Sequence, residues 1–189
     1  MKPDVLESLL QGATETDAIE FKGPMTWDAK NLVKDILAMA NIVDGGAIII
    51  GVEEGETFER RGLTPAHLAS YKSDDMRDQI APYADPRVIF SRQIVEDATG
   101  LRYVVIEVEP FEEIPVICAR DGHDVQAGAI YYRSRARRPE SARVSRSEDM
   151  REIVESAIVR RSRQLQRIGF APEAGADLQQ ALDQELDGL

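Results

Sequence analysis

The segment Ala47-Ile48-Ile49-Ile50-Gly51-Val52-Glu53 constrains the fold of this chain most strongly. It is apolar without the polar alternation of a half-buried strand, and Gly45-Gly46 stands directly before it. A short continuous apolar run bounded by glycines is typical of a strand buried on both faces of a sheet. Such a strand needs cover on each side, so the run predicts a layered α/β domain.

The rest of the chain supplies both kinds of element. Residues 17–22 alternate like a strand, with Ala18, Glu20 and Lys22 opposite Ile19 and Phe21. The other predicted elements are a helix over 3–11, a helix from Trp27 capped by Thr26, a helix over 64–80 capped by Thr64, a hairpin of 87–96 and 101–109, strands over 114–119 and 129–133, and a long helix opened by a Ser145–Glu148 capping box.

These elements predict an α/β (mixed α+β) fold, in which a mixed sheet is flanked by helices and a long helix closes the domain. We expect one domain over residues 1–168. Residues 169–189 carry five acids and no base, which predicts an acidic tail that is flexible or loosely docked.

Several classes of protein are disfavoured by composition. The longest apolar run is far shorter than the roughly 20 residues of a membrane helix, so we expect no membrane span. The first ten residues lack the apolar core of a secretory signal. Cys118 is the only cysteine, which excludes an internal disulfide and a cysteine-rich zinc site. No G-x-x-x-x-G-K-[ST] phosphate loop occurs. We expect a cytoplasmic protein.

The charge is distributed unevenly along the chain. The net charge is −11, yet residues 133–168 hold eleven arginines against five acids. Arginine pairs well with phosphate and carboxylate groups, so this segment is a candidate to bind a polyanion. The alternative is that these arginines form a solvated helix face or pair with the chain's own surplus acids.

Acidic residues gather around the two most strand-like segments. Glu15 and Glu20 lie at the first, and Glu53 and Glu54 directly follow the apolar run. If the two strands pair, carboxylates from both could converge and bind a hard cation such as Mg²⁺ or Mn²⁺. Glu15 and Glu20 are an odd number of residues apart, so convergence requires Glu15 to lie in a turn or beyond a bulge. The alternative is a set of solvated acids at strand ends.

Three blocks of the sequence resemble the Schlafen-type domains, also called AlbA-like DNA-binding domains. Glu15-Thr-Asp-Ala-Ile-Glu20-Phe21-Lys22 resembles the family's E-[ST]-x-x-x-E-F-K signature, and residues 38–55 resemble its A-F-A-N-T-x-G-G-x-[IL]-x-I-G-V-[DE]-[DE]-x-G block. A looser third block covers Gly128–Ser134 and Arg137-Arg138-Pro139. The likeness covers roughly residues 7–160 and implies a single Schlafen-like lobe.

The resemblance implies a function in nucleic-acid binding, on DNA or RNA. Animal Schlafen proteins use two such lobes as an endoribonuclease on structured RNA with three acids. Carried over to this chain, the catalytic and metal-binding acids are Glu15, Glu20 and Glu54, with Mg²⁺ or Mn²⁺ as the cofactor. The third acid is a glutamate rather than an aspartate, and its longer side chain could misplace the metal. The alternative is a non-catalytic DNA-binding, regulatory or nucleotide-binding module, the last using the Gly45-Gly46 turn.

The same resemblance gives the basic residues a role. We expect phosphate contacts from Lys22, Arg133, Arg135, Arg137 and Arg138, and base stacking by Tyr131 or Tyr132. Because one lobe is half of the animal core, the resemblance also implies a homodimer in which two lobes form one groove. The apolar stripe Met150–Ile158 could pack on its own domain or on a partner copy.

Overall fold

The computed structural model of the protein describes residues 1–11, 16–55, 58–134 and 140–170. Its centre is a four-stranded mixed sheet in the order β1 (Ile19–Lys22), β2 (Gly46–Ile50), β7 (Arg102–Val108) and β6 (Phe90–Glu96). β1 and β2 run parallel, whereas β2–β7 and β7–β6 are antiparallel. The predicted mixed sheet and the predicted hairpin are therefore confirmed.

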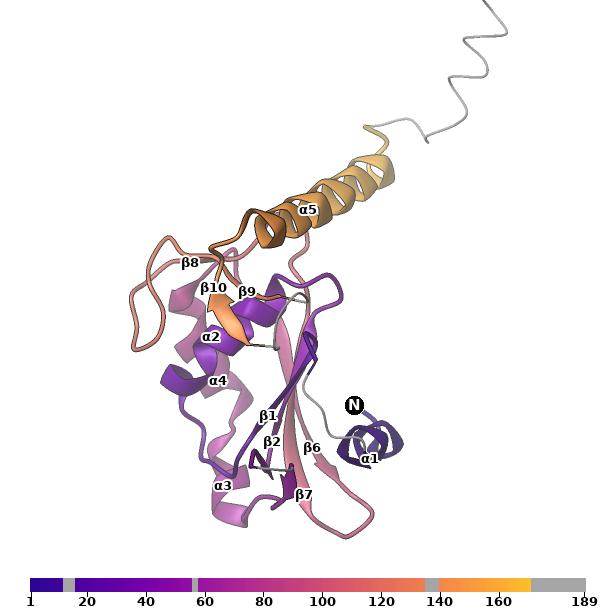
Figure 1. The fold of residues 1–189 in the computed structure, drawn as a ribbon, viewed down its shortest axis with the longest axis vertical. Coiled ribbons are helices and arrows are strands. Elements are labelled where there is room, and N and C mark those ends of the chain that lie inside the picture. Colours follow the sequence, from indigo (N-terminus) through magenta and orange to yellow (C-terminus); the bar gives the residue numbers. More distant parts are fainter. Residues whose placement is uncertain (12–15, 56–57, 135–139, 171–189) are drawn as a thin grey trace, which may run out of the picture.

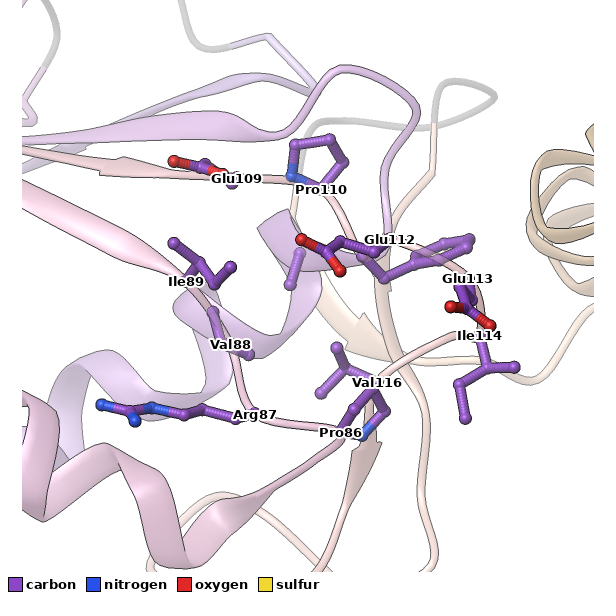
Figure 2. A pocket seen from close by; sticks show the side chains of 12 residues that line it. Pro86, Arg87, Val88, Ile89, Glu109, Pro110, Glu112, Glu113, Ile114 and Val116 are labelled. Carbon is purple, nitrogen blue, oxygen red and sulfur yellow. The ribbon is translucent and has the colours of Figure 1, made fainter. Parts of the chain in front are cut away.

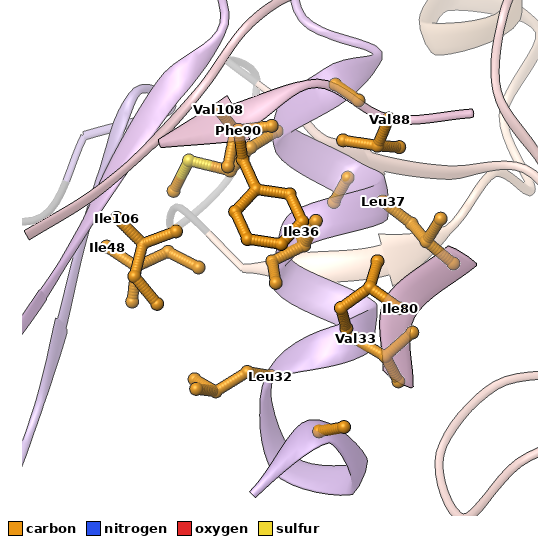
Figure 3. Packing of buried hydrophobic residues seen from close by; sticks show 14 of the residues in the cluster. Leu32, Val33, Ile36, Leu37, Ile48, Ile80, Val88, Phe90, Ile106 and Val108 are labelled. Carbon is orange, nitrogen blue, oxygen red and sulfur yellow. The ribbon is translucent and has the colours of Figure 1, made fainter. Parts of the chain in front are cut away.

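Helices cover both faces of this sheet (Figure 1). Helix α2 (Ala29–Ala40) connects β1 to β2 and packs with α3 (Pro65–Ser70) and α4 (Ser73–Ile80) on one face. Figure 3 shows Leu32 and Ile36 of α2 against Ile48, Ile106 and Phe90 of the sheet.

Helix α1 (Pro3–Gln11) covers the other face through Leu6 and Leu10, which pack with Phe21, Ile49 and Val105. Ile48, Ile49 and Ile50 have no exposed surface, so β2 is buried on both sides as its sequence predicts.

The remaining strands form short pairs around the sheet. They are β3 (Val52–Glu53) with β4 (Glu59–Arg60), β5 (Ala84–Asp85) with β8 (Ile117–Cys118), and β9 (Tyr131–Arg133) with β10 (Ser141–Arg143); a 3-10 turn, η1, covers Ala81–Tyr83. The β9–β10 pair packs against α2. This contact places the last two strands of the chain against the helix that follows β1.

Helix α5 (Ser147–Arg167) is the long helix predicted for the end of the domain (Figure 1). Ile153 is its one fully buried residue and packs with Ile42 and Tyr132. Across the described residues, no helix is long and apolar enough to cross a membrane. The predicted acidic tail lies outside the described residues, apart from its first two positions.

Three predicted helix boundaries differ from the structure. Residues 64–80 form two helices rather than one, because Tyr71 leaves the helical conformation, buries its ring and donates its hydroxyl to Met25 O at 2.9 Å. Helix α2 is capped by Asp28, which accepts from Lys30 N at 2.9 Å, and not by Thr26. Helix α5 begins after Arg146 without a side-chain cap, so the predicted Ser145 cap is wrong. The Thr64 cap is confirmed by a bond from His67 N at 3.2 Å.

Candidate nucleic-acid interface

Arg133 ends strand β9 and has no exposed surface. Its Nη1 donates to Glu20 Oε2 at 2.6 Å and to Ser141 Oγ at 3.2 Å. Its Nε donates to Asp17 O, and its Nη2 to the carbonyl oxygens of Thr16 and Ile19. These bonds use all five N–H groups of a guanidinium, so Arg133 ties β9 to the start of β1.

Glu20 is the partner at the centre of this contact and is itself 8% exposed. Its second carboxylate oxygen, Oε1, lies 2.5 Å from Lys22 Nζ. Lys22 also reaches Asp35 Oδ2 of α2 at 3.1 Å. The alternation of β1 sends Glu20 and Lys22 to the same face, as the sequence predicts, and the structure shows that this face meets Asp35 of α2. The result is a compensated cluster of two acids and two bases, which we call the Glu20–Arg133 cluster.

The electrostatics of Lys22 follow from this cluster. Burial alone would lower the pKa of Lys22, because a low-dielectric surrounding disfavours its charge. The carboxylates of Asp35 and Glu20 outweigh burial, and the pKa of Lys22 is raised above its ordinary value. Lys22 therefore stays charged over the physiological range, with 30% of its side chain exposed.

The cluster bears on the predicted phosphate contacts. Arg133 cannot reach a phosphate without leaving five partners inside the protein, so its buried position favours the alternative that it pairs with an acid of the chain. Lys22 is half-buried, and its exposed part can meet a ligand. Arg135, Arg137 and Arg138 lie outside the described residues, and their phosphate contacts remain predictions.

The structure describes two of the three predicted catalytic acids. Glu20 lies in β1 opposite Ile48, whereas Glu54 is exposed on the loop that follows β3. Glu53, beside it, pairs with Arg61 at 3.0 Å. Glu15 lies outside the described residues. Among the residues that the structure describes, no group of three or more His, Cys, Asp and Glu side chains could hold a metal ion.

The fit of Mg²⁺ or Mn²⁺ to Glu20 can be judged from its contacts. Each carboxylate oxygen of Glu20 already accepts from a cationic group, Lys22 or Arg133. A divalent cation at Glu20 would stand directly beside these two cationic groups, which would repel it. Among the described side chains, the surroundings of Glu20 therefore disfavour a metal ion in this arrangement.

The two predicted stacking residues are both buried. Tyr131 is 5% exposed and belongs to the main core, and its hydroxyl accepts from Gln126 N at 2.9 Å. Tyr132 is 4% exposed, and its hydroxyl donates to Glu152 Oε2 of α5 at 2.6 Å. Neither ring presents a face on which a base could stack, so that expectation is wrong for this arrangement.

The second half of α5 carries four arginines, Arg160, Arg161, Arg163 and Arg167. Arg160 donates to Val43 O and lies over the ring of Phe111, and Arg161 pairs with Glu113. Arg163 and Arg167 are exposed, and neither has an ion pair with another described residue. The first half of α5 is acidic, with Glu148 and Asp149 in its first turn. The bases therefore lie at the far end of the helix.

A hollow of about 280 Å³ lies beside the core, between residues 86–89 and 109–116 (Figure 2). Its wall combines apolar side chains, such as Val88 and Val116, with three carboxylates, Glu109, Glu112 and Glu113. Arg87 also lines the hollow, and Glu113 pairs with Arg161 of α5. This wall has no excess of positive charge, so a polyanion is not expected in this hollow.

Two polar residues of the interior were missed by sequence reasoning. Asp35 is 3% exposed in α2, among apolar positions that read as one helix face. Asn41, which ends α2, is 1% exposed; it donates to Val116 O and Tyr131 O, each at 2.9 Å, and accepts from Val116 N at 2.8 Å. The signal for Asn41 was present, because it stands in the A-x-A-N block.

The fold and the sequence motifs agree with those of a known protein family. The family profile described as Schlafen, AlbA_2 matches residues 15–140, and the chain belongs to this family. No curated protein matches the chain.

Two solved structures share the fold at low identity. One is the DIP2311 protein of Corynebacterium diphtheriae, with 20% identity and a TM-score of 0.50 over 78% of this chain. The match spans 27% of that longer protein. The other is the N-terminal domain of a protein from Nitrosomonas europaea described as related to the ATP-dependent DNA helicase RecG. It has 20% identity and a TM-score of 0.51, with 77% of this chain and 93% of that domain covered.

Proposed function

We propose that this Schlafen, AlbA_2 domain binds the phosphate backbone of nucleic acid through the basic half of α5. The observation that carries the proposal is the group of four arginines at residues 160–167, of which Arg163 and Arg167 are exposed and lack ion pairs with other described residues. In a chain with a net charge of −11, a polyanion can be attracted only where positive charge is local. Membership of the family and the helicase-related name of one structural neighbour support the same class of ligand.

Contacts of this kind position a nucleic acid without reading its sequence. Arg163 and Arg167 line a hollow of about 340 Å³ together with Glu112 and Glu113. Both tyrosines of β9 are buried and offer no surface for base stacking. We therefore propose binding to the backbone of DNA or RNA with little sequence preference. Affinity should fall steeply with salt, because counterions are released when phosphates are neutralised.

Binding is proposed in preference to cleavage. Metal-dependent cleavage would need Glu15 and Glu54 to join Glu20, and Glu20 is neutralised by Lys22 and Arg133. Nucleotide binding at Gly45-Gly46 has less support. The space beside Gly45 is filled by Val108 O and Pro110, and that beside Gly46 by Met39. The two glycines therefore allow the neighbouring segments to pack closely against this turn.

The binding proposal is tested by fluorescence anisotropy on a labelled hairpin RNA and a labelled DNA duplex over a range of salt concentrations. The double variant Arg163→Glu/Arg167→Glu should weaken binding and reduce the slope of log K against log salt by about one unit per arginine. The matched control is Lys30→Glu/Arg87→Glu, which makes the same charge change at exposed sites away from α5. Equal affinity of the two double variants, or no binding by the wild type at low salt, would contradict the proposal.

The same samples separate binding from cleavage. Wild type and Glu20→Gln are incubated with transfer RNA and Mn²⁺ or Mg²⁺, and the products are resolved on a denaturing gel. Intact RNA with the wild type supports a binding domain. Cleavage that disappears in Glu20→Gln, while its circular dichroism spectrum is retained, would establish the nuclease instead.

A further inference from the structure

Strand β6 forms an open edge of the central sheet. Glu109 N donates to Ile89 O and Asp97 N donates to Leu101 O, each at 2.9 Å, which fixes the phase of the β6–β7 ladder. Odd-numbered residues of β6 turn their backbone groups toward β7, and Arg92, Ile94 and Glu96 turn theirs outward. No described residue makes a hydrogen bond to these outward backbone groups. The edge can therefore pair with another strand.

The side chains along this edge have a symmetric pattern. Arg92, Ile94 and Glu96 share one face of β6, with the apolar residue between a base and an acid. Ile94 is 44% exposed. Neither Arg92 nor Glu96 forms an ion pair within the described chain, although Arg102 stands opposite Glu96 on β7. Arg92 Nε is buried and lacks a hydrogen-bond partner among the described residues.

We propose that β6 pairs antiparallel with β6 of a second copy of this chain, about a two-fold axis at Ile94. In this register Ile94 faces its own counterpart, and Arg92 of each copy faces Glu96 of the other. The outward backbone groups of all three positions then join the ladder between the copies. Cross-strand pairs of opposite charge stabilise an antiparallel sheet, and like charges directly opposite destabilise it.

The symmetry of the charges on β6 indicates which chain can pair with this edge. Charged residues on an edge strand commonly prevent pairing, because two identical edges bring like charges together. Here the base and the acid are equally spaced about Ile94, so a two-fold axis brings unlike charges together. The edge is complementary to itself, which makes a second copy of this chain the expected partner.

This dimer would place the two copies in one continuous sheet. Strand β1 lies at the opposite edge from β6, so the two Glu20–Arg133 clusters would stand at the outer ends of that sheet. The two copies would then not enclose a shared groove between their β1 strands. The inference does not depend on the proposed nucleic-acid binding.

The test uses sedimentation velocity on the full chain and two charge reversals. Arg92→Glu alone should raise the dimer dissociation constant by roughly tenfold, because two attractive pairs become two repulsive ones. Arg92→Glu/Glu96→Arg should restore the wild-type constant, since the pairs are exchanged. Lys30→Glu, an equal charge change at an exposed site of α2, should leave it unchanged. Circular dichroism verifies that each variant is folded.

Amide exchange followed by NMR tests the register. In the wild type at high protein concentration, the amides of Arg92, Ile94 and Glu96 should be protected. In Arg92→Glu they should exchange faster, whereas Gln93 and Val95, which bond to β7, stay protected. A monomeric wild type, a dimer whose outward amides are unprotected, or a double swap that fails to restore the dimer would each overturn the proposal.

Discussion

Arg133 and Glu20 are 113 positions apart in the chain, and Arg133 Nη1 lies 2.6 Å from Glu20 Oε2 inside the protein. The pair joins β9 to β1, and the neighbouring Lys22–Asp35 contact joins β1 to α2. A buried ion pair stabilises a fold only when every donor and acceptor is matched. Both carboxylate oxygens of Glu20 and all N–H groups of the Arg133 guanidinium have partners, so replacement of either residue should strongly lower the free energy of unfolding.

Replacement of Arg133 by methionine should lower the free energy of unfolding by roughly 3–5 kcal/mol, because Glu20 would lose its buried partner. Urea denaturation followed by circular dichroism measures the change. The double variant Arg133→Met/Glu20→Gln should be less destabilised than the sum of its single variants, since no uncompensated charge remains. Additive effects would show that the two side chains are energetically independent.

Asn41→Asp tests the polar contacts at the end of α2. The substituted carboxylate has the size of the amide but cannot donate to Val116 O and Tyr131 O. We expect a loss of roughly 3 kcal/mol or more, since two buried acceptors lose their donor and a charge is buried. Asn31→Asp, at an exposed position of α2, is the control; it loses one exposed bond to Asp28 at 3.3 Å and should change stability much less. Equal thermal melting of the two variants would contradict this role.

Gly45→Ala tests the close approach of the turn before β2. Gly45 has φ +69°, and an added Cβ would lie 2.2 Å from Val108 O. Gly100 has φ +86° with open space around it, so Gly100→Ala carries the backbone strain without the contact. Gly45→Ala should therefore be clearly less stable than Gly100→Ala, by roughly 1–3 kcal/mol in urea denaturation. A smaller difference in the free energy of unfolding would mean that β7 shifts to make room for the added Cβ.

Asp97 gives a prediction for acid pH. Burial alone would raise the pKa of Asp97, but hydrogen bonds from Thr99, Tyr103 and Leu101 outweigh it and leave the pKa below its ordinary value of 3.8. The ionised carboxylate thus stabilises the fold above the unfolded pKa, and this contribution is lost as the pH falls through the folded value. Asp97→Asn should be less stable than the wild type near neutrality.

The stability gap between the wild type and Asp97→Asn should narrow between about pH 5 and pH 2. Urea denaturation at each pH measures it. The control Asp74→Asn, at an exposed site of α4, should show little change in its gap. A gap for Asp97→Asn that is constant with pH would show that the carboxylate has the same pKa in the folded and unfolded chains.

Much of the fold could be predicted because its signals are local. The apolar run at Ile48–Ile50 predicts a strand covered on both sides, and the alternation of residues 19–22 predicts which side chains share a face; both are confirmed. The break between α3 and α4 could not be predicted, because it depends on the tertiary contact of Tyr71 with Met25 O. Thr26 and Asp28 are both good caps, and only the path of the chain selects Asp28.

The site was harder to predict because its contacts join distant segments. Glu20 could be assigned to the same strand face as Lys22, but Arg133 was one of several arginines with the same apparent role. Alternation in β9 could not single it out, because Tyr131, Tyr132 and Arg133 are all buried. Whether Glu15 and Glu54 approach Glu20 stays a prediction.

The long-range tie between β9 and β1 also has a consequence for biosynthesis. While the ribosome has made only the first strands and α2, Glu20 and Asp35 have Lys22 as their sole basic partner in the cluster. The arginine that completes the charge balance emerges much later, so the nascent polypeptide should reach its native state only after residue 141 has left the exit tunnel.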